Sequence, residues 1–237
     1  MLPKLPIATF EYTLPISKKK IHYKPYTVRE EKILLIAAAS DNPRDMVNAV
    51  KQVINNCIVE EDVDVVEFPL FDLEVLLLLL RIVSTSNEVE LKFHDKEDDK
   101  IYDFTISLED VISKSIAAAK PVEKVIELKD GIGVIMKELT IDVIMSGELD
   151  NLNDPEKMYD VLQGLIDSIY DKEELHKAED ASREEFTDFL DSFDKDASSK
   201  LSSYFIDLPK LSHTLTYKNT KGTEREIRLE GINDFFQ

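Results

Sequence analysis

The sequence is poor in the residues that build several common kinds of site. It has one cysteine, six glycines and no tryptophan among its 237 residues. A single cysteine excludes an intramolecular disulfide and a cysteine-based zinc site. Cys57 ends an apolar helical pattern, which is typical of a small buried residue. The chain also lacks the nucleotide-binding patterns G-x-x-x-x-G-K-[ST] and G-x-G-x-x-G and the nucleophile pattern G-x-S-x-G.

Catalytic and metal-binding patterns are equally scarce. The four histidines are scattered, and no two have the i, i+4 spacing of a helical metal site. His94 precedes the run DKEDDK, which lacks the glycine and the glutamate of an EF-hand loop and is typical of a solvated hairpin tip. Paired carboxylates are frequent in so acidic a chain and do not indicate acid–base catalysis. We therefore expect no enzyme activity, no metal and no cofactor.

Basic residues are also few relative to acidic residues. There are 29 lysines and arginines against 48 aspartates and glutamates, for a formal net charge of −19. Such a chain repels DNA and anionic lipid, so we expect neither nucleic acid nor membrane as a partner. The opening MLPKLPIATFEYTLP has three prolines and no apolar core of a signal peptide. These features predict a soluble intracellular protein that binds other proteins.

One long apolar run stands out, FDLEVLLLLLRIVS at residues 71–84. A membrane span needs about 20 apolar residues, whereas Asp72, Glu74 and Arg81 interrupt this run. A helix that is apolar nearly all round is buried on most sides. The run therefore predicts a core helix with Leu77 near its centre.

The remaining patterns alternate between hairpins and helices, and they predict an α+β fold in which helices pack with several antiparallel β-hairpins. Proline, Asn/Asp and Ser-rich stretches separate the elements. We expect hairpins at 10–26, 88–111, 121–139 and 211–230, and helices at 28–40, 43–58, 72–84, 139–147, 153–175, 183–193 and 198–209.

The same order of features occurs in residues 87–111 and 211–235. Each segment has an alternating strand, a charged turn and a second strand ending I-x-L-E. The match indicates two similar helix–hairpin modules, either by duplication or because hairpins resemble one another. It predicts domains at 1–115 and 150–237, joined by a connecting strand pair and short helix at 116–149.

Several stretches, taken in order, resemble a known family. They are KPYTVREEKILLIA, a helix ending INNCI, the block FPLFDLEVLLLLLRIVS before EVELKF, and the close LEGINDFF. Together they are similar to the baseplate hub assembly chaperone family of T-even-type contractile-tailed bacteriophages. Some members have cysteine pairs in their hairpins, like a zinc knuckle. Here the turns are HDKEDDK and KNTKGTE, so metal binding is not carried over.

The resemblance implies a late viral protein acting in the host cytoplasm, with baseplate hub and tape-measure proteins as clients. The alternatives are a permanent subunit of the virion's tail baseplate and an acidic DNA mimic that inhibits a host protein. The oligomeric state is open. A partner needs a strand edge or an apolar patch. The candidate partner-binding residues are Phe10, Tyr12, Tyr23, Leu215, Tyr217, Phe235 and Phe236.

Overall fold

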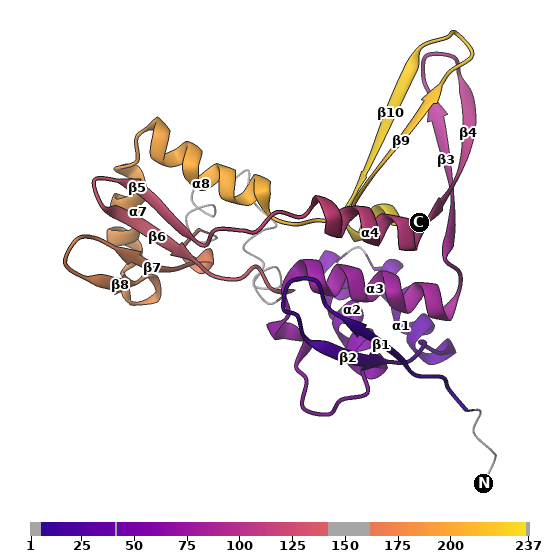
Figure 1. Ribbon diagram of the computed structural model, residues 1–237, viewed down its shortest axis with the longest axis horizontal. Helices are drawn as coiled ribbons and strands as arrows, with labels where there is room; N and C mark the ends of the chain where they lie inside the picture. The colour runs from indigo at the N-terminus through magenta and orange to yellow at the C-terminus, as the bar shows by residue number, and fades with distance from the viewer. Residues whose placement is uncertain (1–5, 41, 142–161, 236–237) are drawn as a thin grey trace. The chain divides into compact units, whose positions relative to one another are not determined.

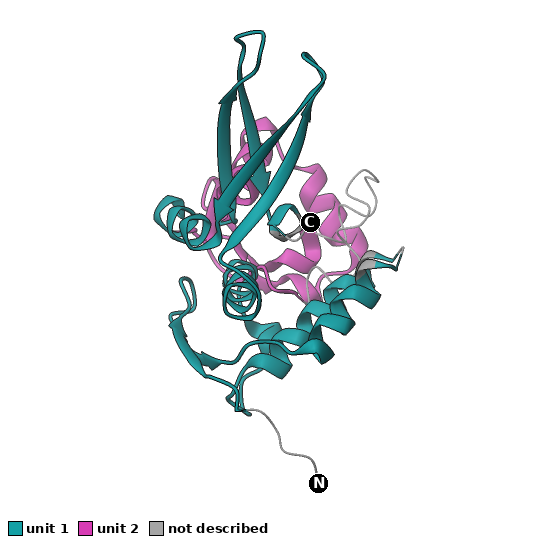
Figure 2. Cartoon of the chain, turned by 90° about the vertical axis from the view of Figure 1, so that its right-hand side faces the viewer, with its two compact units in different colours: residues 1–119, 209–237 teal, residues 120–208 magenta. Residues whose placement is uncertain are grey.

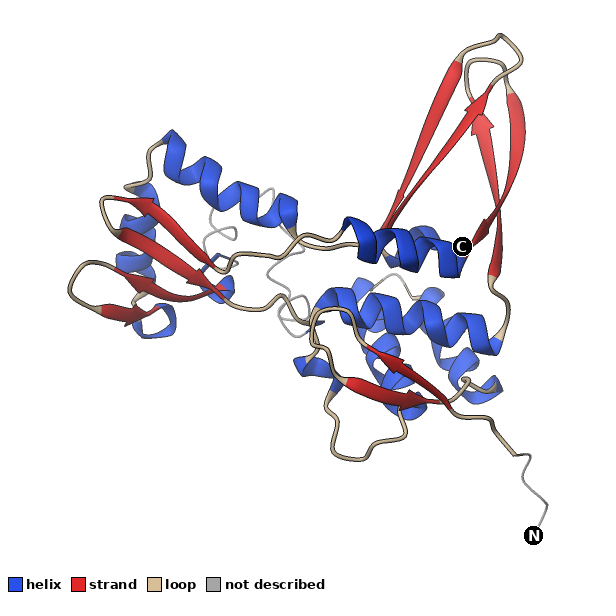
Figure 3. Cartoon of the chain, in the orientation of Figure 1, coloured by secondary structure: helices blue, strands red, loops and turns tan. Residues whose placement is uncertain are grey.

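The computed structural model describes residues 6–40, 42–141 and 162–235. The chain folds into two compact units (Figure 2). Unit 1 consists of residues 1–119 and 209–237, and unit 2 consists of residues 120–208. Helices and antiparallel hairpins follow one another along both units (Figure 3), so the predicted α+β class is confirmed.

Unit 1 begins with the predicted hairpin and two helices. Strand β1 (Phe10–Thr13) pairs with β2 (Lys20–Tyr23), and helices α1 (Val28–Ala38) and α2 (Pro43–Cys57) follow. Thr27 and Glu30 form a reciprocal capping box at the start of α1. Asn42 caps α2, with Pro43 in the first turn, where its missing N–H costs nothing.

The leucine-rich run forms helix α3 (Leu70–Ser84), preceded by the short turn η1 (Val65–Glu67). Every residue from Phe71 to Leu80 is buried, which confirms the prediction of a core helix. Across the described ranges, no helix is long and apolar enough to cross a membrane.

A second hairpin follows α3, with β3 (Glu88–Asp95) paired in antiparallel register with β4 (Lys100–Ser107). The prediction that the returning strand continues to residue 111 was wrong, because β4 ends at Ser107 and helix α4 (Leu108–Ala118) follows it directly. The Ser107 hydroxyl accepts a hydrogen bond from the Asp110 N–H, and Glu109 and Asp110 occupy the first turn. Both features favour a helix start and could have been recognised in the sequence.

The end of the chain returns to unit 1. Strands β9 (Ser212–Lys218) and β10 (Glu224–Glu230) form the predicted closing hairpin, and the turn η4 (Ile232–Phe235) follows it. The hairpin extends beside β3–β4 (Figure 1). The two hairpins that match in sequence thus lie side by side in one unit, although the 104 residues from 108 to 211 separate them along the chain.

Unit 2 is a four-stranded antiparallel sheet with helices packed on it. Its strands are β5 (Val125–Lys129), β6 (Ile132–Met136), β7 (Ile166–Tyr170) and β8 (Leu175–Lys177), paired in that order. The turn η3 (Ala178–Asp180) and helices α7 (Arg183–Asp191) and α8 (Lys195–Asp207) follow. The core of unit 2 includes Val134, Ile166, Phe186, Leu190 and Leu201.

The helix predicted over residues 153–175 is confirmed at residues 162–165 and was wrong from residue 166 onward, and residues 153–161 lie outside the described residues. Residues 162–165 are helical, but Ile166–Tyr170 is strand β7. Val134 of β6 pairs with Ile169, so tertiary pairing outweighs the helical spacing of the apolar residues. Most of the helix predicted at 139–147 also lies outside the described residues.

The division into units differs from the predicted domains. The sequence groups residues 209–237 with the preceding helices, whereas the compact units group them with residues 1–119. The reason is that β9 packs against α4 and that the closing hairpin contacts β3–β4.

Candidate partner-binding surfaces

The N-terminal hairpin presents one exposed aromatic ring. Phe10 is 38% exposed, and its ring centroid lies 5.8 Å from that of Tyr23, which is buried. Tyr12 is half-buried. The segment after α2 covers the outer edge of β2. The Lys24 N–H donates to the Cys57 carbonyl, and the Val59 N–H donates to the His22 carbonyl, both at 2.9 Å. Of the three predicted residues, Phe10 is thus the accessible one.

His22 adds charge to the same hairpin. Its Nδ1 lies 2.7 Å from a Glu60 carboxylate oxygen, and its Nε2 lies 3.2 Å from Glu11. The hydrogen bond to Glu60 raises the pKa of His22, and Glu11 adds to the effect. Because Glu11 and His22 form the cross-strand pair next to Phe10 and Tyr23, this charged group lies on the opposite face of the hairpin from Phe10.

The closing hairpin turns its predicted residues inward. Leu215 and Tyr217 are half-buried on the face of β9 that meets β3–β4. The Tyr217 ring centroid lies 4.5 Å from Tyr102, 5.5 Å from Phe104 and 6.1 Å from Phe93. Tyr217 thus fills the space between the two hairpins, and binding a partner there would require them to separate.

Polar contacts join the tips of these two hairpins. The Tyr217 hydroxyl donates to the buried Asp95 carboxylate at 2.8 Å, and burial together with this carboxylate raises the pKa of Tyr217 to about 12. The Asn219 amide donates to Glu97 at 2.7 Å, and the Arg225 guanidinium donates to Glu97 at 2.8 Å. Within the described ranges, no group of three or more His, Cys, Asp and Glu side chains could hold a metal ion.

Of the two C-terminal phenylalanines, only Phe235 lies within the described residues. Phe235 is fully buried, and its carbonyl accepts a hydrogen bond from the Arg81 guanidinium at the end of α3. Its side chain belongs to the core of unit 1, so a partner could contact Phe235 only if this turn moved away from the core. Phe236 lies outside the described residues.

Helix α1 carries an exposed apolar surface that the sequence reasoning missed. Val28, Leu35 and Ile36 are 79%, 65% and 64% exposed, and we call these three residues the α1 outer face. The opposite side of the helix, through Glu30 and Ala37, is buried. The signal was present in the run Ile33–Ile36, because four consecutive aliphatic residues cover more than one face of a helix.

Cys57 has the properties of a core residue. It is buried, and burial together with the nearby Glu30 carboxylate raises the pKa of its thiol to about 12. Since the thiolate is the nucleophile, this thiol is unsuited to covalent catalysis.

Comparison with known proteins assigns the chain to a family. Neither the curated proteins nor the solved structures gave a match. The family model described as T4 bacteriophage base plate protein matches residues 7–237, which includes both units and every surface described above. The chain therefore belongs to the T4 bacteriophage base plate protein family.

Proposed function

We propose that this protein is a non-enzymatic chaperone or adaptor for assembly of the baseplate central hub, with hub or tape-measure proteins as its clients. It acts in the host cytoplasm during tail assembly. Membership of the baseplate family supports a role among phage tail proteins. The observation that carries the finer proposal is the α1 outer face.

The α1 outer face has the properties of a client-binding surface. Three large aliphatic side chains project into solvent from a helix whose other side is packed. Leu35 and Ile36 are adjacent in this face, and exposed apolar side chains that lie together mark protein interaction sites more often than single exposed residues do. The capping box at Thr27 and Glu30 holds the first turn of the helix in place, so the surface is presented on a rigid element.

Co-expression with the hub and tape-measure proteins of the same phage tests the proposal. We expect one of them to co-elute with the chain in size-exclusion chromatography. The double variant Leu35→Gln/Ile36→Gln should abolish co-elution, because glutamine keeps the helix but removes the apolar contact. Ile206→Gln on α8, where the side chain is 73% exposed, is the matched control and should co-elute normally.

Two results would contradict the proposal. One is the absence of any complex with the client proteins. The other is equal loss of co-elution in the control variant, which would mean that the α1 outer face has no special part in binding. Mass spectrometry of purified virions then separates a chaperone from a permanent subunit, because only a subunit is recovered in stoichiometric amount.

A further inference from the structure

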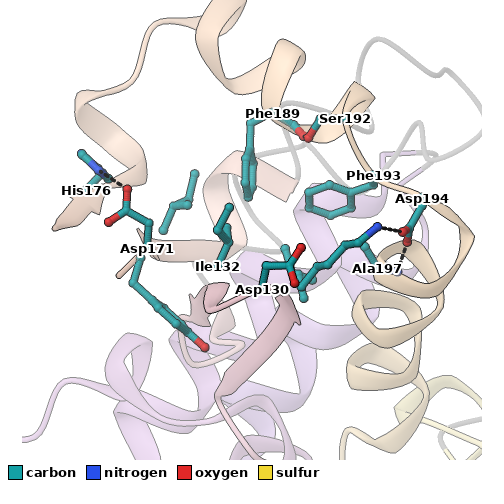
Figure 4. Close-up of a pocket in the computed structure, with 13 residues that line it drawn as sticks. Asp130, Ile132, Asp171, His176, Phe189, Ser192, Phe193, Asp194 and Ala197 are labelled. Carbon is teal, nitrogen blue, oxygen red and sulfur yellow. Dashed lines mark hydrogen bonds and ion pairs between the residues drawn. The ribbon is translucent and has the colours of Figure 1, made fainter. Parts of the chain in front are cut away.

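Unit 2 contains a pocket that is separate from the surfaces of unit 1. It has a volume of about 420 Å³ and lies between the strands β5–β7 and the junction of α7 with α8. Ile132 lies at its centre, and the rings of Phe189 and Phe193 point toward it (Figure 4). The volume falls within the range of pockets that accept a small ligand or a large side chain, roughly 300–1,000 Å³.

The floor of the pocket is apolar and open to solvent. Ile132 is 41% exposed, and the half-buried Ile169 lies on the neighbouring strand β7. Phe189 and Phe193 pack edge to face with ring centroids 5.0 Å apart. A side chain that covered this floor would remove apolar surface from water, at about 25 cal/mol for each Å².

The rim of the pocket is acidic. Asp130, Asp171 and Asp194 line it, against Lys129 and His176. Lys129 contacts Asp194 at 2.9 Å, and His176 lies 3.9 Å from Asp171 (Figure 4). The backbone N–H groups of Glu173 and Glu174 donate to Asp171 and lower its pKa, so this carboxylate is ionised at neutral pH.

The charge of the whole unit has the same sign. Residues 120–208 include 10 lysines and arginines against 23 aspartates and glutamates, a formal net charge of −13 out of −19 for the chain. This field repels anions and attracts cations toward an apolar pocket. An occupant must therefore combine positive charge with an apolar side chain.

We infer that this pocket binds a basic segment of a partner protein, which inserts one leucine or phenylalanine side chain between Ile132, Phe189 and Phe193. Lysines or arginines that flank the inserted side chain contact Asp130 and Asp171 at the rim. The apolar floor supplies affinity, and the acidic rim selects the charge of the partner and speeds association. The inference rests on unit 2 alone and does not depend on the client role proposed for α1.

A fluorescein-labelled synthetic helix of lysine and alanine with a central Leu–Phe pair is the probe. We expect its fluorescence anisotropy to rise on addition of the full-length protein. Two counterparts complete the set: one has glutamate in place of lysine, and the other has serine in place of the Leu–Phe pair. Both should bind at least about tenfold more weakly, a difference of about 1.4 kcal/mol.

Variants of the protein locate the site. The double variant Asp130→Asn/Asp171→Asn removes two rim charges, and Asn suits the positive φ of 54° at residue 130. Glu138→Gln/Asp207→Asn removes the same charge from unit 2 outside the pocket and is the matched control. Phe193→Ala removes part of the apolar floor. We expect the rim variant and Phe193→Ala to weaken binding about tenfold and the control to bind like the unmodified chain.

Two outcomes would overturn the inference. If the rim and control variants lose the same affinity, the attraction is a general effect of net charge and not of this pocket. If the serine counterpart binds as well as the Leu–Phe peptide, no side chain enters the pocket. Circular dichroism checks that each variant remains folded, and Phe193→Leu, which keeps an apolar side chain, should retain more binding than Phe193→Ala.

Discussion

Two buried carboxyl groups on α3 connect the leucine-rich helix to the rest of unit 1. Asp72 is fully buried and accepts hydrogen bonds from the Ile16 and Ser17 N–H groups, each at 2.8 Å. Glu74 accepts from the Leu211 N–H at 3.2 Å. Because residues two apart do not share a helix face, the pair holds two different hairpins, β1–β2 and β9–β10.

Glu74 should make the stability of unit 1 depend on pH. Burial raises its pKa from 4.5 to about 7, so the folded chain holds the proton more tightly than the unfolded chain does. The resulting contribution to the free energy of unfolding is complete below pH 4.5 and is lost as the pH rises through about 7. At 1.36 kcal/mol for each pKa unit, the loss is about 3 kcal/mol.

Glu74→Gln removes this titration while keeping the shape of the neutral carboxyl group. Urea unfolding below pH 4.5 and again well above pH 7 measures the change in stability for each protein. Between the two pH values, we expect the free energy of unfolding of the variant to fall by about 3 kcal/mol less than that of the unmodified chain. The control is Glu90→Gln, which changes an exposed carboxylate on β3. The explanation fails if Glu74→Gln loses as much stability as the unmodified chain.

Asp72 should matter through its hydrogen bonds. Asp72→Ala leaves the half-buried Ile16 and Ser17 N–H groups without their acceptor and should lower the free energy of unfolding by about 1–3 kcal/mol in total. Asp72→Asn keeps one acceptor oxygen and should cost less. Urea unfolding at constant pH measures both variants. Equal stability of the alanine variant and the unmodified chain would contradict this role.

At the scale of the elements, the paired hairpins show how two weak structures support each other. An isolated two-stranded hairpin is marginally stable in water. Here the apolar faces of β3–β4 and β9–β10 cover one another around Tyr217, and hydrogen bonds between the two tips close the far end. Each hairpin therefore depends on a segment more than a hundred residues away.

Tyr217 should be the residue on which this pairing depends most. Tyr217→Ala removes the ring that contacts three aromatic neighbours and should clearly lower the free energy of unfolding. Tyr217→Phe loses only the hydrogen bond to Asp95 and should lower the free energy of unfolding less than Tyr217→Ala does. Thr216 is exposed on the opposite face of β9, and Thr216→Ala should change stability by less than about 0.5 kcal/mol.

Chemical unfolding gives these differences, and hydrogen exchange of the β9 amides shows whether the hairpin opens locally. If Tyr217→Ala and Thr216→Ala cost the same, the contact between the hairpins contributes little to the fold.

At the scale of the whole molecule, the two units have separate cores. Leu77 is buried in unit 1, and Phe186 is buried in unit 2. An uncompensated charge at either position cannot be accommodated without unfolding the core around it. We therefore expect Leu77→Asp to unfold unit 1 and Phe186→Asp to unfold unit 2.

Amide NMR spectra of the two variants test this separation, because residues of an intact unit keep their dispersed signals. The pocket peptide should still bind Leu77→Asp, whereas co-elution with a client should be lost. Simultaneous loss of both sets of signals in either variant would mean that the chain unfolds as one cooperative body. If Leu77→Asp folds normally but no longer binds a client, then Leu77 belongs to a binding surface and not to the core.

The sequence by itself determined the features that depend on neighbouring residues. The sequence predicts a helix cap at Thr27, a second cap at Asp41 or Asn42, the alternating strands of the hairpins and the burial of the leucine-rich run. Each depends on residues a few positions apart, where local hydrogen bonds and apolar periodicity act directly. The family resemblance rested on the same local stretches and agrees with the matched family model.

Where the sequence was compatible with two local structures or two degrees of burial, only the tertiary structure decided between them. Residues 166–170 have helical spacing but become a strand because β6 offers an unpaired edge. Helix α1 is apolar on two sides, and only its packing shows that Val28, Leu35 and Ile36 stay uncovered. Tyr217 alternates as an edge residue would, yet a distant hairpin covers it. In each case the deciding contact comes from a segment far along the chain, which local patterns do not record.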